Sequence, residues 1–61
     1  MNEVIKIFMK RDGMTKREAV QRFKGVREEV ADIINEGGSY DEVEDVLLCE
    51  RLEMDYVYYF I

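Results

Sequence analysis

Residues 15–42 have the sequence TKREAVQRFKGVREEVADIINEGGSYDE, and this stretch sets the helical framework of the chain. Thr15 with Glu18, and Ser39 with Glu42, each fit a capping box, in which a hydroxyl and a carboxylate satisfy backbone N–H groups at the start of a helix. Between the two boxes, apolar residues recur every three or four positions until a glycine pair at 37–38. The stretch predicts a helix over residues 15–36 and another over residues 39–53.

The residues before this stretch predict a further helix over residues 2–12. Its apolar residues form one stripe at positions i, i+1, i+4 and i+5: Val4, Ile5, Phe8 and Met9. Gly13 directly after it is typical of a helix that ends in a left-handed residue, with Met14 folding back on the last turn. A strand over residues 4–9 is the alternative, because Val, Ile and Phe also favour strands.

At the other end, Asp55 is suited to cap a last short helix over residues 55–61. The expected fold class is therefore all-α: a single domain, residues 1–61, in which three to four short helices form a small helical hairpin or bundle. Gly25 interrupts the long helix at a cost of about 1 kcal/mol relative to alanine. It is interpreted either as a tolerated surface glycine or as a point of close approach by another helix.

A chain of 61 residues is near the lower limit for a self-sufficient core. One cysteine and no histidine exclude an internal disulfide and a typical zinc site, which are the usual reinforcements of so small a domain. The helix over residues 15–36 would span roughly 33 Å, which is too long for the rest of the chain to cover. We therefore expect a homodimer, most simply through this helix and with two-fold symmetry.

The sequence argues against an enzyme. Without histidine, Cys49 has no base to activate it, and we interpret it as a small buried apolar residue. Neighbouring carboxylates on one helix diverge by about 100° and cannot converge on a substrate. No glycine-rich phosphate loop or calcium loop is present. We expect no catalytic residue, no metal and no cofactor.

Charge is divided between the two halves of the chain. Residues 5–27 hold eight of the nine basic residues with two acids, whereas residues 28–61 hold eleven acids with Arg51 alone. Either the halves fold together and neutralise each other, or the acidic half presents a face to a basic partner. Both can hold at once.

The basic half allows two other functions. Four basic side chains that could line one side of a helix would suit phosphate contacts: Lys16, Arg17, Arg22 and Lys24. A pI near 4.6 argues against direct nucleic-acid binding. A regulatory or antitoxin-like module that uses this side remains an alternative, as does a nucleotide sponge built at a dimer interface from three arginines: Arg17, Arg22 and Arg27.

The last six residues, 56–61, are YVYYFI, and so apolar a terminus is seldom left in water. They either pack back on the chain's own helices or form a contact surface for a second copy or another protein. No apolar run approaches the length that crosses a bilayer, and no export signal opens the chain. A soluble, cytoplasmic protein with no membrane contact is expected.

Three runs of the sequence resemble a group of short phage and prophage proteins. They are residues 11–15 (RDGMT) with Glu18, Ala19 and Arg27 after them, residues 44–47 (EDVL), and residues 52–56 (LEMDY). Endings in that group often have the form Gly-Leu-Glu-Pro-Asp-Tyr, whereas this chain has Arg51 and Met54 at the glycine and proline positions. This departure suggests that the last turn runs on as helix in this chain. The resemblance transfers no functional residue.

The resemblance implies a small accessory factor that binds and disables a bacterial host protein, such as a restriction or CRISPR defence component. An acidic surface suits targets that have basic nucleic-acid channels. The residues expected to meet the lysines and arginines of the target are Asp41, Glu42, Glu44 and Asp45. The expected aromatic anchors are Tyr40, Tyr56, Tyr58 and Tyr59.

Overall fold

The computed structural model describes residues 2–61, and every regular element in that range is a helix. The elements in chain order are α1 (Glu3–Arg11), α2 (Lys16–Asn35), α3 (Tyr40–Cys49) and the 3₁₀ helix η1 (Met54–Tyr59). The predicted all-α class is confirmed. Residues 4–9 lie within α1, so the alternative of a strand there is wrong.

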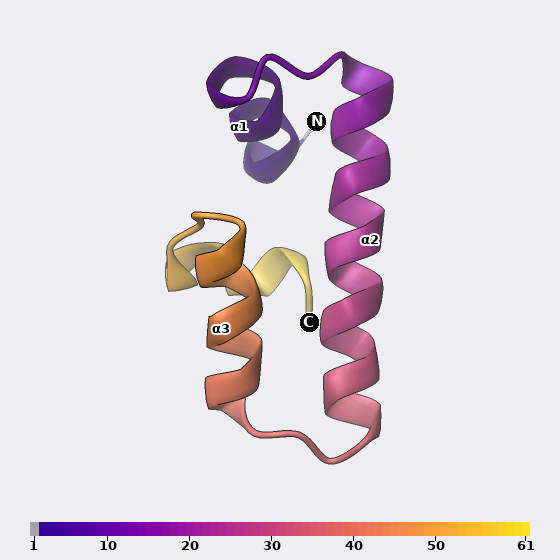
Figure 1. The fold of residues 1–61 in the computed structure, drawn as a ribbon, viewed down its shortest axis with the longest axis vertical. Helices are drawn as coiled ribbons and strands as arrows, with labels where there is room; N and C mark the ends of the chain where they lie inside the picture. Colours follow the sequence, from indigo (N-terminus) through magenta and orange to yellow (C-terminus); the bar gives the residue numbers. More distant parts are fainter. Residues whose placement is uncertain (1) are drawn as a thin grey trace.

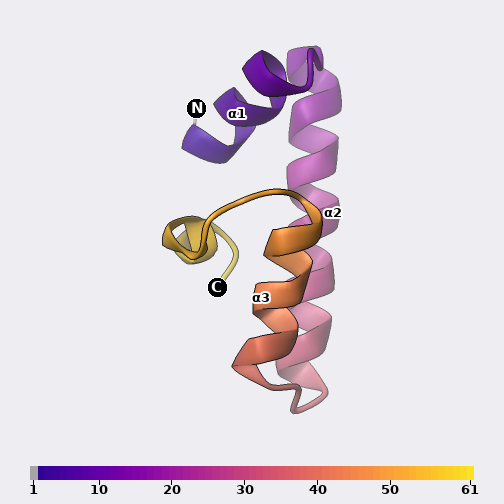
Figure 2. The same cartoon turned by 60° about the vertical axis from the view of Figure 1, so that its left-hand side comes forward.

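Helix α2 is the spine of the molecule, whose longest dimension is 33 Å (Figure 1). Helix α1 packs on its N-terminal half and α3 on its C-terminal half, and η1 lies between α1 and α3 (Figure 2). The apolar side of α2 is buried along its length by these elements, through Ala19, Phe23, Val26 and Val30. The rest of the chain thus covers these four residues, whereas Ile34 in the last turn of α2 remains 49% exposed.

The first predicted capping box is confirmed. The Glu18 amide donates to Thr15 Oγ1 at 3.2 Å, and the Thr15 amide donates to Glu18 Oε1 at 2.9 Å. These bonds lower the pKa of Glu18, chiefly through the Thr15 backbone N–H. The second box is half formed: the Glu42 amide donates to Ser39 Oγ at 3.4 Å, but within residues 2–61 the Glu42 carboxylate does not return a bond.

Two helices end at glycines in the left-handed region, as the sequence predicts. Gly13 has φ +67° and Gly37 has φ +77°. After Gly37, the Gly38 amide donates to the Ile33 carbonyl at 2.7 Å, and a Cβ on Gly38 would overlap the Ile33 side chain. The glycine pair is thus required both by the turn and by the space available.

Helix α3 ends at Cys49, so the predictions that it reaches residue 53 and runs on past the glycine position are wrong. Arg51 has φ +56°, the only positive φ of a non-glycine residue within residues 2–61. Around it the Arg51 amide donates to the Leu48 carbonyl and the Leu52 amide to the Leu47 carbonyl, each at 2.9 Å. This is the turn that glycine normally makes after a helix. An arginine makes it here.

The C-terminal aromatic segment is split between core and surface. Val57 and Phe60 are buried, and the Phe60 ring lies 5.0 Å from the Phe23 ring between centroids. Tyr58 and Ile61 are exposed. The prediction that Asp55 caps the last helix is wrong. Helix η1 begins at Met54, with Glu53 at the cap position, so Asp55 lies in its first turn.

Candidate functional site

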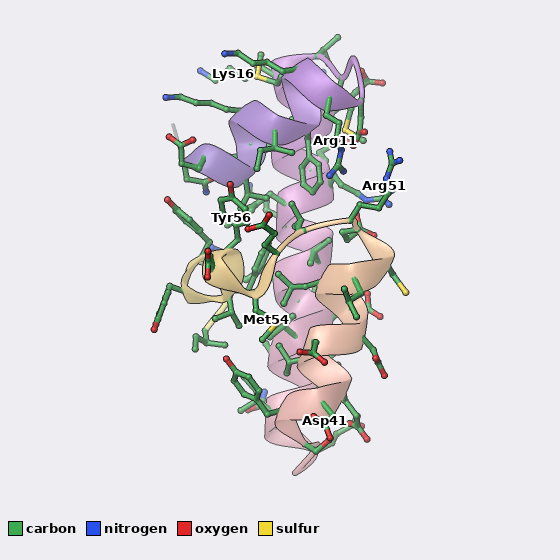
Figure 3. The ribbon with its side chains drawn as sticks, turned by 90° about the vertical axis from the view of Figure 1, so that its left-hand side faces the viewer. Arg11, Lys16, Asp41, Arg51, Met54 and Tyr56 are labelled. Carbon is green, nitrogen blue, oxygen red and sulfur yellow. The ribbon has the colours of Figure 1, made fainter. Side chains whose placement is uncertain are left out.

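Five charged residues where α1, α2 and α3 meet form a network that we call the polar junction: Arg11, Asp12, Arg22, Glu50 and Arg51. The Arg11 guanidinium donates to the Glu50 carbonyl at 2.8 Å and to the Arg51 carbonyl at 2.7 Å, across forty residues of chain. Figure 3 shows Arg11 and Arg51 together beside the end of α3. A cation at the C-terminus of a helix is favoured by the helix dipole. Arg11 therefore caps α3 from a distant part of the sequence.

Asp12 orients the Arg11 guanidinium. Its two carboxylate oxygens each accept a bond from Arg11 at 2.9 Å, and Arg51 lies 3.5 Å away. These bonds lower the pKa of Asp12 below its ordinary value, chiefly through the hydrogen bond from Arg11. The same hydrogen bond raises the pKa of Arg11. Asp12 thus links Arg11 and Arg51 beside the end of α3.

Arg22 completes the polar junction from α2. Its guanidinium makes two bonds to the Glu50 carboxylate, at 2.6 and 2.9 Å, and the Glu50 side chain is only 15% exposed. The hydrogen bonds to Glu50 raise the pKa of Arg22. Arg22 thus turns toward α3, whereas Arg27 lies over the Phe23 ring, 5.7 Å from its centroid. The structure does not bring Arg17, Arg22 and Arg27 into one site.

The acids at the start of α3 have a different environment. Asp41, Glu42, Glu44 and Asp45 are all exposed, and none forms an ion pair within residues 2–61. The spacing i, i+3, i+4 places Asp41, Glu44 and Asp45 on one side of the helix, and we call these three residues the acidic face. Leu48, which is 60% exposed, continues this side by one turn. Glu42 lies on another side, next to Gly38.

Tyr40 belongs to a second surface next to the acidic face. With Ile34 and Ile61 it forms the apolar patch, in which the three side chains are 62%, 49% and 63% exposed respectively. They line a shallow hollow of about 200 Å³, together with Val43 and the turn between α2 and α3. Ile61 belongs to the C-terminal segment that was predicted either to pack back or to form a contact surface, whereas the exposure of Ile34 was not predicted. The adjacent pair at 33–34 was the available signal, because two neighbouring helix residues cannot both point straight inward.

The C-terminal tyrosines do not join the acidic face. Tyr56 is half-buried and lies 6.4 Å from Tyr59 between ring centroids. In Figure 3, Tyr56 lies at the level where η1 approaches α1, whereas Asp41 lies at the far end of α3. Tyr58 is 80% exposed and Tyr59 is 37% exposed. The predicted site residues thus divide into an acidic group with Tyr40 and a separate group on η1.

The molecule has a basic end and an acidic end. Lys6 and Lys10 on α1 and Lys16 on α2 lie toward the end opposite the acidic face, and Figure 3 shows Lys16 and Asp41 at the two extremes. The two charged halves neutralise each other at the polar junction, where Arg22 pairs with the Glu50 carboxylate. Beyond the junction, both ends keep exposed charge. Both interpretations of the divided charge are therefore compatible with the fold.

Other candidate chemistry is sparse. Cys49 is exposed, so the prediction that it is buried is wrong: it lies on the outward side of α3, half a turn from Leu47. Among residues 2–61, no three side chains that ligate metals gather into a group. In the same range, no helix has both the length and the apolar character to cross a bilayer.

Comparison with known proteins yields no relative: no family model, curated protein or solved structure matches the chain.

Proposed function

We propose that this protein binds a basic surface of another protein and blocks it by stoichiometric occlusion. The observation that carries the proposal is the acidic face: Asp41, Glu44 and Asp45 are exposed side by side, and no basic group of residues 2–61 pairs with them. Leu48 offers an apolar contact at the end of this face. A patch of one charge with an apolar neighbour suits a protein partner of the opposite charge.

The needs of the fold explain only part of this acidic cluster. Asp41 and Glu42 lie in the first turn of α3, where negative charge is favoured by the helix dipole. Glu44 and Asp45 lie beyond that turn, where the effect of the dipole has decayed. They lie three and four residues after Asp41, a spacing at which like charges on a helix repel each other. A partner that supplies lysines or arginines would remove this repulsion.

The resemblance to short phage and prophage proteins supports a particular setting for this binding. We propose a bacterial host protein as the target, in the host cytoplasm, and a defence component with a basic nucleic-acid channel as the class of target. In that setting the acidic face would occupy positions that nucleic-acid phosphates otherwise take. The protein would act without catalysis, by occupying the channel.

The runner-up function uses the opposite end of the molecule. Lys16, Arg17 and Lys24 are exposed on α2, which supports a regulatory module that contacts nucleic acid. Mobility shifts that weaken steeply with salt would favour this alternative. The engagement of Arg22 with Glu50 weakens the case for the nucleotide sponge, which needs that arginine free.

The test is affinity capture from a bacterial lysate with two matched variants. Asp41→Asn, Glu44→Gln and Asp45→Asn together neutralise the acidic face, whereas Lys6→Gln with Lys10→Gln removes the two α1 lysines of the basic end. We expect the wild-type protein and the lysine variant to retain the same basic protein in a stoichiometric complex, and the amide variant to lose it. Retention of the same proteins by all three forms, or capture of none, would contradict the proposal.

A further inference from the structure

A ridge of exposed and half-buried side chains runs along one side of α2, and we call it the α2 ridge: Val20, Lys24, Arg27, Ala31 and Ile34. The members are spaced alternately by four and three residues, the spacing of a seam between two paired helices. Two shallow hollows follow this side of α2, the first around Val20 and the second between Lys24 and Ala31. The ridge ends at Ile34, in the apolar patch. It is thus a continuous strip with apolar residues at both ends.

The charge beside the α2 ridge changes sign along the helix. Lys16, Arg17 and Lys24 lie in its first half, whereas Glu28 and Asp32 lie in its second half. A parallel copy would place like charges together. An antiparallel copy would place each half against its opposite, so the strip is complementary to itself in one orientation only.

We propose that two copies of this chain pair antiparallel along the α2 ridge, with Val20 of each copy seated in the apolar patch of the other. The interface of a two-fold dimer is formed by the same residues from both copies. Placing Val20 opposite Ile34 puts the axis at Arg27. It also brings Lys24 within side-chain reach of Glu28 of the second copy.

Arg27, the residue at the two-fold axis, is compatible with this arrangement. Arg27 faces its own counterpart there, which would be unfavourable if both guanidinium groups pointed across the interface. In the structure the Arg27 guanidinium lies over the Phe23 ring of its own chain, 5.7 Å from the ring centroid. The aliphatic stem of such an arginine can cover apolar surface while its charge stays at the rim.

The second copy also accounts for apolar surface that the single chain leaves in water. Ile34, Tyr40 and Ile61 are each about half exposed or more, although they adjoin one another. Large adjoining apolar groups on a small protein mark an interaction site. Tyr40 is thereby assigned to the contact between copies. Asp41 and Asp45 lie more than a quarter turn of α3 away from Tyr40, so this pairing leaves them accessible, whereas Glu44, one turn after Tyr40, lies at the edge of the contact.

The experiment measures solution mass by sedimentation equilibrium on the full chain alone. We expect a mass of twice 7.3 kDa that falls toward 7.3 kDa on dilution. Val20→Asp and Ile34→Asp should each raise the dissociation constant at least tenfold. Leu48→Asp, at an exposed site off the ridge, should leave it unchanged. Circular dichroism on every variant separates loss of pairing from loss of folding.

A charge exchange tests the register. Lys24→Glu alone and Glu28→Lys alone should each weaken the dimer severalfold, because each places like charges across the interface, and the two together should restore it. A mass of 7.3 kDa at every concentration up to about 1 mM would overturn the proposal. So would a dimer that is indifferent to Val20→Asp and Ile34→Asp, or a double exchange that fails to restore pairing. Because no foreign partner is present, these outcomes are independent of the proposed inhibitory function.

Discussion

The polar junction and the acidic face both contain exposed or half-buried carboxylates, but the carboxylates of the two regions have opposite environments. In the polar junction, Glu50 receives two bonds from Arg22, and Asp12 receives two from Arg11. On the acidic face, Asp41, Glu44 and Asp45 have no ionic partner within residues 2–61. The first group joins three helices, and the second joins no other element of residues 2–61. Residue type alone therefore does not tell which carboxylates serve the fold and which are available to a partner.

The largest expected effect is a difference in how much the polar junction and the acidic face contribute to the free energy of unfolding. Arg11→Ala removes the bonds to the Glu50 and Arg51 carbonyls and should lower the free energy of unfolding by about 1–3 kcal/mol, as expected for hydrogen bonds to a charged group. The triple change Asp41→Asn, Glu44→Gln and Asp45→Asn should alter it by about 0.5 kcal/mol or less. Urea denaturation measures both. Equal losses would show that the acidic face also supports the fold.

The next effect concerns the strained end of α3. Arg51→Gly relieves the positive φ of +56° and should stabilise the protein by about 1 kcal/mol, since a left-handed conformation costs an L-residue about 1–2 kcal/mol. The opposite change, Gly37→Ala at φ +77°, should destabilise it. Thermal unfolding of the two variants provides the comparison. A loss of stability in Arg51→Gly would mean that the contact with Asp12 outweighs the backbone strain.

A smaller gain is expected on the exposed side of α2. A Cβ at Gly25 would meet no atom within 4 Å, so close approach by another helix of this chain is excluded. Gly25→Ala should therefore stabilise the helix by about 0.5–1 kcal/mol. It should also leave the solution mass unchanged, because Gly25 lies off the α2 ridge. A lower mass in this variant would place a partner copy against this side of α2.

The smallest effect is a pH dependence below neutrality. The pKa values of Asp12 and Glu18 are lowered in the folded chain by hydrogen bonds from Arg11 and from the Thr15 backbone. Their stabilisation is complete above the unfolded-state pKa of about 4 and is lost as the pH falls through the lower folded-state values. Denaturation between pH 7 and pH 2 should show a decline that is shallower in Glu18→Gln. An identical decline in that variant would assign the effect to other carboxylates.

Local signals in the sequence predicted most of the helical framework. Thr15, Gly13 and the glycine pair at 37–38 act within a few residues of themselves, and the structure has them where the patterns indicate. The end of α3 could not be predicted this way, because Arg11 reaches it from forty residues away. The same limit applies to the candidate site. The sequence separates acidic from basic residues, but only the packing of three helices decides that Glu50 is paired and Asp45 is not.

The most direct measurement is a calorimetric titration of the captured target with three forms of the protein: wild type, the amide variant of the acidic face, and Lys6→Gln with Lys10→Gln. If the acidic face is the binding surface, the amide variant should bind at least tenfold more weakly, whereas the lysine variant should remain within about threefold of wild type. The wild-type affinity should also fall as salt is raised. Undiminished binding by the amide variant, with loss in the lysine variant, would contradict this assignment and transfer the function to the basic end.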